Sequence, residues 1–214
     1  MKIALIGATG YVGSFILNEA LHRGHQVTAI VRHPEKLPQH KNLIAKGGDV
    51  FNENQLAKLL AGHDAIICAF NPGWDNPTAI YDLHVKGTNH IINAVKRSGV
   101  KRLLMVGGAG SLEVVPGKQL VDTPDFPAQW KQGALGTREA LHILKKQHDL
   151  EWTFLSPSAL LEPGERTGKY RIGGDQLLTD AAGKSKISTQ DYAVAMIDEL
   201  EHPKHVRKRF TVGY

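Results

Sequence analysis

Three glycines near the start of the sequence are spaced so that they could hold a diphosphate. They stand at positions 7, 10 and 13, after the apolar run Ile3 to Ile6 and before an apolar helical pattern. This order predicts a strand, a tight turn and the N-terminus of a helix. Gly7 permits the turn, Gly10 lets a pyrophosphate approach the backbone, and Gly13 allows the helix to pack closely on the strand. With the positive end of the helix dipole, the turn predicts a dinucleotide site.

A second chemical signal is a pair of basic side chains after the next predicted strand. The strand predicted for residues 26–31 ends on Arg32, nineteen residues after Gly13. At this place an acid selects the free 2′-hydroxyl of the adenosine ribose, whereas an arginine accommodates a 2′-phosphate. Neither Asp nor Glu stands there, and His33 follows, so the sequence favours NADP(H) over NAD(H). The alternative is that Arg32 only faces solvent.

The elements that must position these residues alternate along the chain. This alternation predicts a doubly wound α/β fold, a mainly parallel Rossmann sheet with helices on both faces. A small extension on the substrate side departs from it, with two short strand-like runs in residues 164–187. We expect a single NAD(P)-binding Rossmann domain over residues 1–214, with substrate-side elements at 111–133 and 157–188. The predicted strands are residues 3–6, 26–31, 43–49, 65–70, 102–106, 151–155 and 209–212, and the predicted helices are residues 11–22, 54–60, 79–98, 134–147 and 189–200.

Further candidates follow the two central strands, because ligands of such sheets bind beyond the carboxyl ends of the strands. The loop at residues 71–77 should border the second ribose and the nicotinamide. Within it, Asn71 could donate a hydrogen bond, and Trp74 either supports a ring-shaped substrate or only packs. Ser111 is the first hydroxyl after the strand at 102–106 and its glycine-rich end. We expect orienting roles for Ser111 and Asn71. The predicted substrate pocket consists of Trp74, Ser111, Trp130 and Ser158.

Taken together, the motifs resemble a known family. The glycine spacing, Arg32, Asp49 with Val50, the glycine-rich end of the strand at 102–106, and Ser156 with Pro157 occur in the order seen in atypical short-chain dehydrogenase/reductases. The group most similar contains NADH-flavin reductases, biliverdin/flavin reductase-like proteins and NmrA-like regulators. The resemblance implies that Asp49 and Val50 contact the adenine; an Asx-capped turn is the alternative. The expected cofactor contacts are Gly7, Thr9, Gly10, Tyr11, Val12, Gly13, Arg32, Asp49, Val50, Ala69, Phe70, Asn71, Gly107, Gly108 and Pro157.

The sequence departs from the active members of that family at their catalytic pair. They carry a tyrosine followed four residues later by a lysine, which lowers the pKa of the phenol that donates the proton. None of the tyrosines, at 11, 81, 170, 192 and 214, has a lysine at that distance. Ketone reduction and sugar epimerisation develop charge on an alkoxide and are therefore disfavoured. A flavin or quinone spreads the charge over its own ring, so we favour NADPH-dependent reduction of such an acceptor.

Two other functions stay open at this point. A protein that binds NAD(P) and reports its redox state to a partner, as NmrA-like members do, would equally lack the pair. A sugar epimerase or dehydratase ranks third. The sequence also leaves open a homodimer or a regulatory protein partner, with FMN or FAD as possible substrates.

Composition excludes several classes of protein. The chain has a formal net charge of +5, yet its densest basic run, residues 204–209, resembles a solvated connection, and the absence of interleaved aromatics disfavours nucleic acid. The single cysteine, Cys68, lies in an apolar run, which indicates a core residue of a cytoplasmic protein. The eleven histidines show no metal-ligand spacing, so we expect no metal. No signal peptide, membrane span or GxSxG motif is expected.

Overall fold

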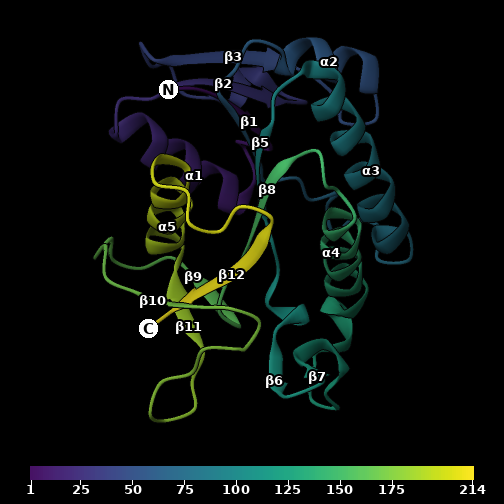
Figure 1. Ribbon diagram of the computed structural model, residues 1–214, viewed down its shortest axis with the longest axis vertical. Coiled ribbons are helices and arrows are strands. Elements are labelled where there is room, and N and C mark those ends of the chain that lie inside the picture. Colours follow the sequence, from purple (N-terminus) through teal and green to yellow (C-terminus); the bar gives the residue numbers. More distant parts are fainter.

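A computed structural model describes all 214 residues and contains one large sheet (Figure 1). The strand order is β10-β12-β8-β5-β4-β1-β2-β3, and every neighbouring pair is parallel except β10 with β12. This is the predicted doubly wound topology. The bounds are β1 Lys2–Ile6, β2 Gln26–Val31, β3 Leu43–Gly47, β4 Ala65–Cys68, β5 Arg102–Val106, β8 Glu151–Ser156, β10 Arg171–Gly173 and β12 Lys208–Gly213.

Helices cover both faces of this sheet (Figure 1). Helices α1 (Tyr11–His22) and α5 (Thr189–Glu201) pack together on one face, and α2 (Glu53–Leu60), α3 (Ile80–Ser98) and α4 (Ala128–Lys145) cover the other. Each face has its own apolar core. Because the central strands are buried on both sides, they are continuously apolar rather than alternating. Cys68 at the end of β4 is buried in one of these cores, as predicted.

Helix α4 begins earlier than predicted. The sequence predicts this helix over residues 134–147, but α4 spans Ala128–Lys145. Pro127 occupies the N-cap position. A proline there costs the helix no hydrogen bond, because the first N–H groups of a helix have no partner within it.

The substrate-side segments contain short strands, and only those of residues 164–188 match strand-like runs predicted from the sequence. Strands β6 (Glu113–Val115) and β7 (Lys118–Gln119) form a hairpin, and β9 (Leu160–Glu162) pairs with β11 (Lys186–Ser188). The two segments meet where the backbone N–H of Glu113 donates to the carbonyl of Asp175 at 2.8 Å. The 3₁₀ turns are η1 Pro34–Lys36, η2 Ala109–Ser111 and η3 Leu120–Asp122.

Helix α5 is capped by Ser188, and Asp191 in its first turn anchors the segment before the helix. Ser188 Oγ accepts a hydrogen bond from the Asp191 N–H at 3.0 Å. The fully buried Asp191 carboxylate accepts from the backbone N–H groups of Thr167 and Gly168, each at 2.8 Å. The Asp191 side chain in the first turn of α5 therefore holds the loop at 163–171.

The basic run at 204–209 is not solvated throughout, which corrects the sequence interpretation. The Arg209 side chain is only 4% exposed. Its Nε donates to Asp175 at 2.7 Å and its Nη1 to the Ser111 hydroxyl at 3.3 Å. This arginine thus links β12 to both substrate-side segments.

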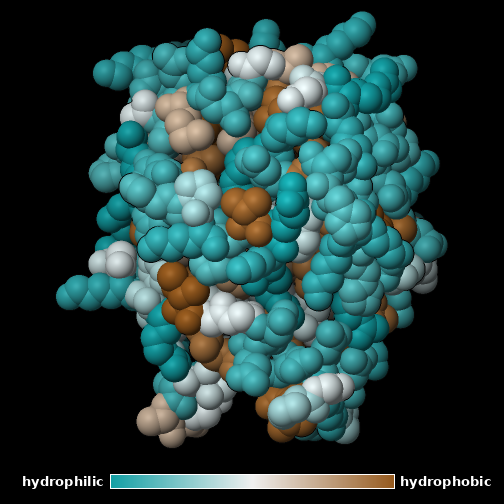
Figure 2. Space-filling model, viewed as in Figure 1, coloured by the Kyte–Doolittle hydropathy of each residue, from teal (hydrophilic) through white to brown (hydrophobic).

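The molecular surface is mainly hydrophilic on the face shown in Figure 2, where apolar residues are scattered among polar ones. None of the helices has the length and the apolar character that crossing a bilayer requires.

Candidate functional site

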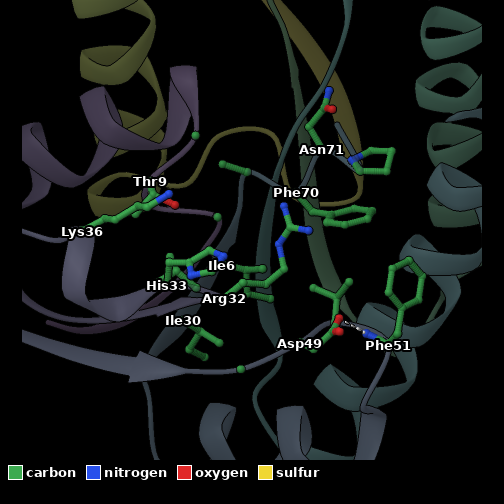
Figure 3. A pocket seen from close by; sticks show the side chains of 17 residues that line it. Ile6, Thr9, Ile30, Arg32, His33, Lys36, Asp49, Phe51, Phe70 and Asn71 are labelled. Atoms are coloured by element: carbon green, nitrogen blue, oxygen red, sulfur yellow. Dashed lines mark hydrogen bonds between the residues drawn. The ribbon is translucent and has the colours of Figure 1, made fainter. Parts of the chain in front are cut away.

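A cavity of about 310 Å³ lies at the carboxyl ends of β1, β2, β3 and β4 (Figure 3). The ends of three of these strands adjoin because β1 pairs with both β2 and β4. The cavity therefore brings together residues from four separate parts of the chain. Its lining is Ile6, Gly7, Thr9, Gly10, Ile30, Val31, Arg32, His33, Lys36, Gly48, Asp49, Val50, Phe51, Ala69, Phe70, Asn71 and Pro72.

The three glycines of the first turn are needed for different reasons. Gly7 has φ +82°, and a Cβ on it would lie 2.5 Å from the Ala69 carbonyl oxygen. A Cβ on Gly13 would lie 2.1 Å from the Gly7 carbonyl oxygen. A Cβ on Gly10 would meet only that same oxygen, at 3.2 Å, and Gly10 lines the cavity. The fold itself requires Gly7 and Gly13, whereas Gly10 leaves space for a ligand.

The amino end of α1 carries no side-chain cap. Gly10 is its N-cap, and the first turn contains no acidic residue. By contrast, Asn52 caps α2 with its side-chain oxygen. Free N–H groups and the positive end of the dipole suit an anion, and here they lie beside the cavity. Both the open space at Gly10 and the uncapped helix fit the diphosphate of a dinucleotide.

Three basic side chains lie on one side of the cavity (Figure 3). Arg32 and His33 follow β2, and Lys36 ends the η1 turn. Arg32 and Lys36 form no ion pair within the protein, while His33 Nδ1 lies 3.2 Å from an exposed carboxylate oxygen of Glu35. Sequence reasoning missed Lys36, although its place four residues after Arg32, beyond a proline turn, was an available signal.

The opposite side of the cavity is formed by Asp49 and aromatic rings. Asp49 Oδ1 accepts from the Phe51 N–H at 2.9 Å, which is the predicted Asx turn, and Asp49 also lines the cavity (Figure 3). The rings of Phe51 and Phe70 meet edge to face, with centroids 6.2 Å apart. Phe51 was not predicted, because nothing in the sequence after Asp49 and Val50 distinguishes a wall residue from an ordinary core aromatic.

Other predicted cofactor residues lie outside the lining. Tyr11, Val12 and Gly13 form the first turn of α1, and Pro157 is buried after β8. At the end of β5, a Cβ on Gly107 would overlap the Phe154 ring at 2.3 Å, and one on Gly108 would meet Thr137 at 3.2 Å. Internal packing therefore accounts for these two glycines.

The hydroxyls and the amide predicted to orient substrate have protein partners. The buried Ser111 accepts from Arg209, and the buried Ser158 Oγ donates to the Val212 carbonyl at 2.8 Å. Asn71 Oδ1 accepts from the Gly73 N–H at 2.8 Å, which leaves its amide nitrogen without a protein partner. Of the three, only Asn71 lines the cavity.

Behind Phe70 lies His84, a buried titratable residue of α3. Its ring meets the Phe70 ring edge to face at 6.0 Å, and Gly136 of α4 leaves space for it, since a Cβ there would lie 2.7 Å from His84 Cβ. The Nε2 atom is buried without a hydrogen-bond partner. Burial lowers the pKa of His84 to about 4, which keeps the imidazole neutral in the folded protein.

This pKa predicts a specific pH dependence of stability. The unfolded chain protonates this histidine below its ordinary pKa of 6.5, whereas the folded chain resists protonation down to about 4. The free energy of unfolding therefore falls between those values as the pH decreases, by about 2 kcal/mol between pH 8 and pH 5 from this residue. We expect the free energy of unfolding of His84→Phe to lack this decrease between pH 8 and pH 5. Urea denaturation of both proteins at pH 8, 6 and 5 measures it, and parallel pH curves would contradict it.

Comparison with known proteins agrees with the geometry of the cavity. The model of a family described as NAD(P)H-binding matches residues 7–203. The chain belongs to this NAD(P)H-binding family. The match includes every segment that lines the cavity except Ile6.

Individual relatives of this NAD(P)H-binding protein cover its full length. The protein YwnB of Bacillus subtilis is 44% identical over 217 residues, which span 99% of this chain and 98% of YwnB. A structure named "putative epimerase" from Bacteroides thetaiotaomicron is 49% identical, with a TM-score of 0.94, 100% of this chain covered and 96% of that chain. One named "putative NADH-flavin reductase" from Streptococcus pneumoniae is 36% identical, with a TM-score of 0.83 and coverage of 100% and 99%. The predicted resemblance to atypical short-chain reductases is confirmed, and with it membership of an NAD(P)-binding oxidoreductase family.

Proposed function

We propose that this protein is an NADPH-dependent reductase that transfers hydride to a flavin or quinone-like acceptor. The observation that carries the proposal is that no tyrosine is followed four residues later by a lysine, in a chain whose cavity fits a dinucleotide. Membership of the NAD(P)H-binding family supports the cofactor half of the proposal. The choice of a flavin or quinone as the acceptor is supported by the environment of the tyrosine side chains.

Three of the five tyrosine hydroxyls are hydrogen-bonded to groups other than lysine and have raised pKa values. Tyr192 donates to the Leu155 carbonyl at 2.6 Å, and burial raises its pKa. Tyr170 donates to Asp198, and burial together with that carboxylate raises its pKa as well. Burial also raises the pKa of Tyr214, whose hydroxyl bonds Ser188 and Asp191. A catalytic phenol needs a lowered pKa, so these residues do not replace the missing pair.

The chain's own part in the proposed reaction is to bind and orient. When bound, NADPH supplies a hydride with two electrons to the acceptor ring, which also takes one proton from water, so that NADP⁺ and the dihydro acceptor form. Gly10 and the first turn of α1 would hold the diphosphate. The side chains of Arg32, His33 and Lys36 would hold the 2′-phosphate, and the Asn71 amide would orient the ring end. As the partner in this reaction we propose a small-molecule ring acceptor, and we propose that the protein acts in the cytoplasm.

A turnover assay tests this proposal. Purified protein should oxidise NADPH in the presence of either FMN or menadione, which is measured as a decrease in absorbance at 340 nm. A reaction without protein is the control. Tight dinucleotide binding that distinguishes oxidised from reduced cofactor, without turnover, would instead support a redox-reporting regulator. Conversion of a nucleotide sugar would favour the epimerase function and contradict the argument from the missing pair.

The preference for NADPH rests on the basic side chains and can be tested separately. We expect Arg32→Asp to weaken NADPH binding by about 1–3 kcal/mol, the value of a charge-assisted hydrogen bond, while NADH binding is unchanged. Lys36→Ala should act in the same direction. Calorimetric titration with both cofactors measures the effect, and Lys41→Ala, an exposed lysine outside the cavity, is the matched control. Equal losses for the two cofactors would contradict the preference.

A further inference from the structure

Two half-exposed tryptophans lie against each other beside the cofactor cavity. The rings of Trp74 and Trp130 have centroids 4.8 Å apart and planes at 85°. Their exposed fractions are 44% and 45%, so each presents much of its ring to solvent. Neither indole N–H has a hydrogen-bond partner in the protein. The third tryptophan, Trp152, differs in both respects, since it is buried and donates to the Gln147 carbonyl at 3.1 Å.

The position of this indole pair is fixed by the structure around it. A Cβ on Gly133 would lie 2.5 Å from the Trp74 ring, so α4 has a glycine at the place where the indole contacts it. Glycine lowers helix stability relative to alanine, and here its small size allows the close approach. The loop that carries Trp74 is shaped by two side-chain caps, Asn71 on the Gly73 N–H and Asn76 on the Ala79 N–H. Trp130 lies in the first turn of α4.

The indole pair is connected by the chain and by packing to the carboxyl ends of two neighbouring strands, β4 and β5. Trp74 belongs to the loop that follows β4, and Asn71 and Pro72 of that loop line the cavity. On the other side, a Cβ on Gly110 would lie 3.0 Å from the Ala134 side chain, next to Gly133, so the glycine-rich end of β5 packs on the same turn of α4. In a doubly wound sheet, these carboxyl ends border the reactive end of the cofactor.

We propose that Trp74 and Trp130 bind the planar ring of the hydride acceptor; this inference rests on the proposed function. Two perpendicular indoles allow a flat, electron-poor ring to stack on one face while its edge meets the other. The two free N–H groups complement ring carbonyl oxygens, which an isoalloxazine and a quinone share. The indoles are positioning residues, and they take no part in the transfer of hydride or proton.

Binding in the presence of NADP⁺ tests the inference without turnover, because the oxidised cofactor cannot reduce the ring. FMN and menadione are titrated separately into the protein saturated with NADP⁺. We expect Trp74→Ala and Trp130→Ala each to raise the Kd of the ring compound about tenfold or more, as removal of an aromatic stacking partner does. Trp74→Phe and Trp130→Phe should remain within about threefold of the wild type, because a ring is retained. The Kd of NADP⁺ should not change in any variant.

The control is Trp152→Phe, which alters a buried tryptophan and should leave both affinities unchanged. Trp130→Ala leaves the Gly133 contact intact, so it remains informative where Trp74→Ala disturbs the loop. If FMN binds and menadione does not, the acceptor is a flavin. If menadione binds and FMN does not, the acceptor is a quinone. The inference is wrong where neither compound binds the wild type, where both alanine variants bind normally, or where NADP⁺ affinity falls in parallel. Ring binding that depends on both indoles but yields no turnover would contradict the proposed function and leave this site standing.

Discussion

We expect Gly10→Val to raise the Kd of a dinucleotide by about two orders of magnitude or more in a protein that still folds. The valine side chain would fill the space beside the uncapped amino end of α1, where the diphosphate is expected. The backbone angles of Gly10, φ −74° and ψ 169°, suit any residue. A Cβ added at this position would contact only the Gly7 carbonyl oxygen, at 3.2 Å. Loss of two charge-assisted hydrogen bonds, each about 1.5–3 kcal/mol, corresponds to a Kd raised about 100-fold or more.

Calorimetry with NADPH measures this loss, and circular dichroism shows whether the fold is retained. Gly174→Ala is the matched control, because no atom lies within 4 Å of a Cβ at that site. Gly13→Ala should behave in the opposite way and destabilise the fold, since its Cβ would overlap the Gly7 carbonyl at 2.1 Å. Unchanged NADPH affinity in Gly10→Val would remove the diphosphate site from this turn.

The largest expected effect on stability comes from the other end of the strands, where Arg102 and Glu199 form a buried ion pair. Their side chains are 9% and 4% exposed, and Nη2 lies 3.0 Å from Oε1. Glu199 Oε1 also accepts from the His205 N–H at 2.9 Å, and Oε2 lies 2.8 Å from His205 Nδ1. Glu199→Ala would leave the guanidinium buried without its charge partner, which typically costs about 3–5 kcal/mol.

Urea denaturation of Glu199→Ala and Glu199→Gln measures this contribution. The glutamine keeps an oxygen acceptor for the loop N–H groups, so we expect it to be less destabilised than the alanine variant. The NADPH affinity of the folded variants should match that of the wild type, because the pair lies at the amino end of β5 and the cavity at the carboxyl ends. A loss below about 1 kcal/mol for the alanine variant would mean that solvent reaches Arg102 after the substitution.

Features encoded by neighbouring residues could be predicted from the sequence. The strand, turn and helix around Gly7, Gly10 and Gly13 follow from adjacent residues, and α1 and β2 have the predicted bounds. Arg32 could be placed beside the cavity because strand length and glycine spacing together locate the end of β2. The long-range order of the sheet followed because alternating units constrain the topology.

What could not be predicted depends on contacts between distant residues. Arg209 lies in a basic run that resembles a solvated connection, and only its pairing with Asp175 and Ser111, 34 and 98 residues away, buries it. The same contact occupies the Ser111 hydroxyl, which the sequence alone left available for substrate. The short strands β6, β7 and β9 have at most three residues each, too few for a periodic pattern. Strands β10 and β11 lie where the sequence predicts two short strand-like runs, in residues 164–187.

We expect the uncapped amino end of α1 to link the lifetime of the protein to the supply of its ligand as well. A helix end that lacks a side-chain partner is completed by whatever anion binds there, so the bound form is selectively protected from unfolding. At a dinucleotide concentration 100 times the Kd, this protection amounts to about 2.7 kcal/mol. Proteases that attack the unfolded chain would therefore remove this protein faster from a cell depleted of dinucleotide.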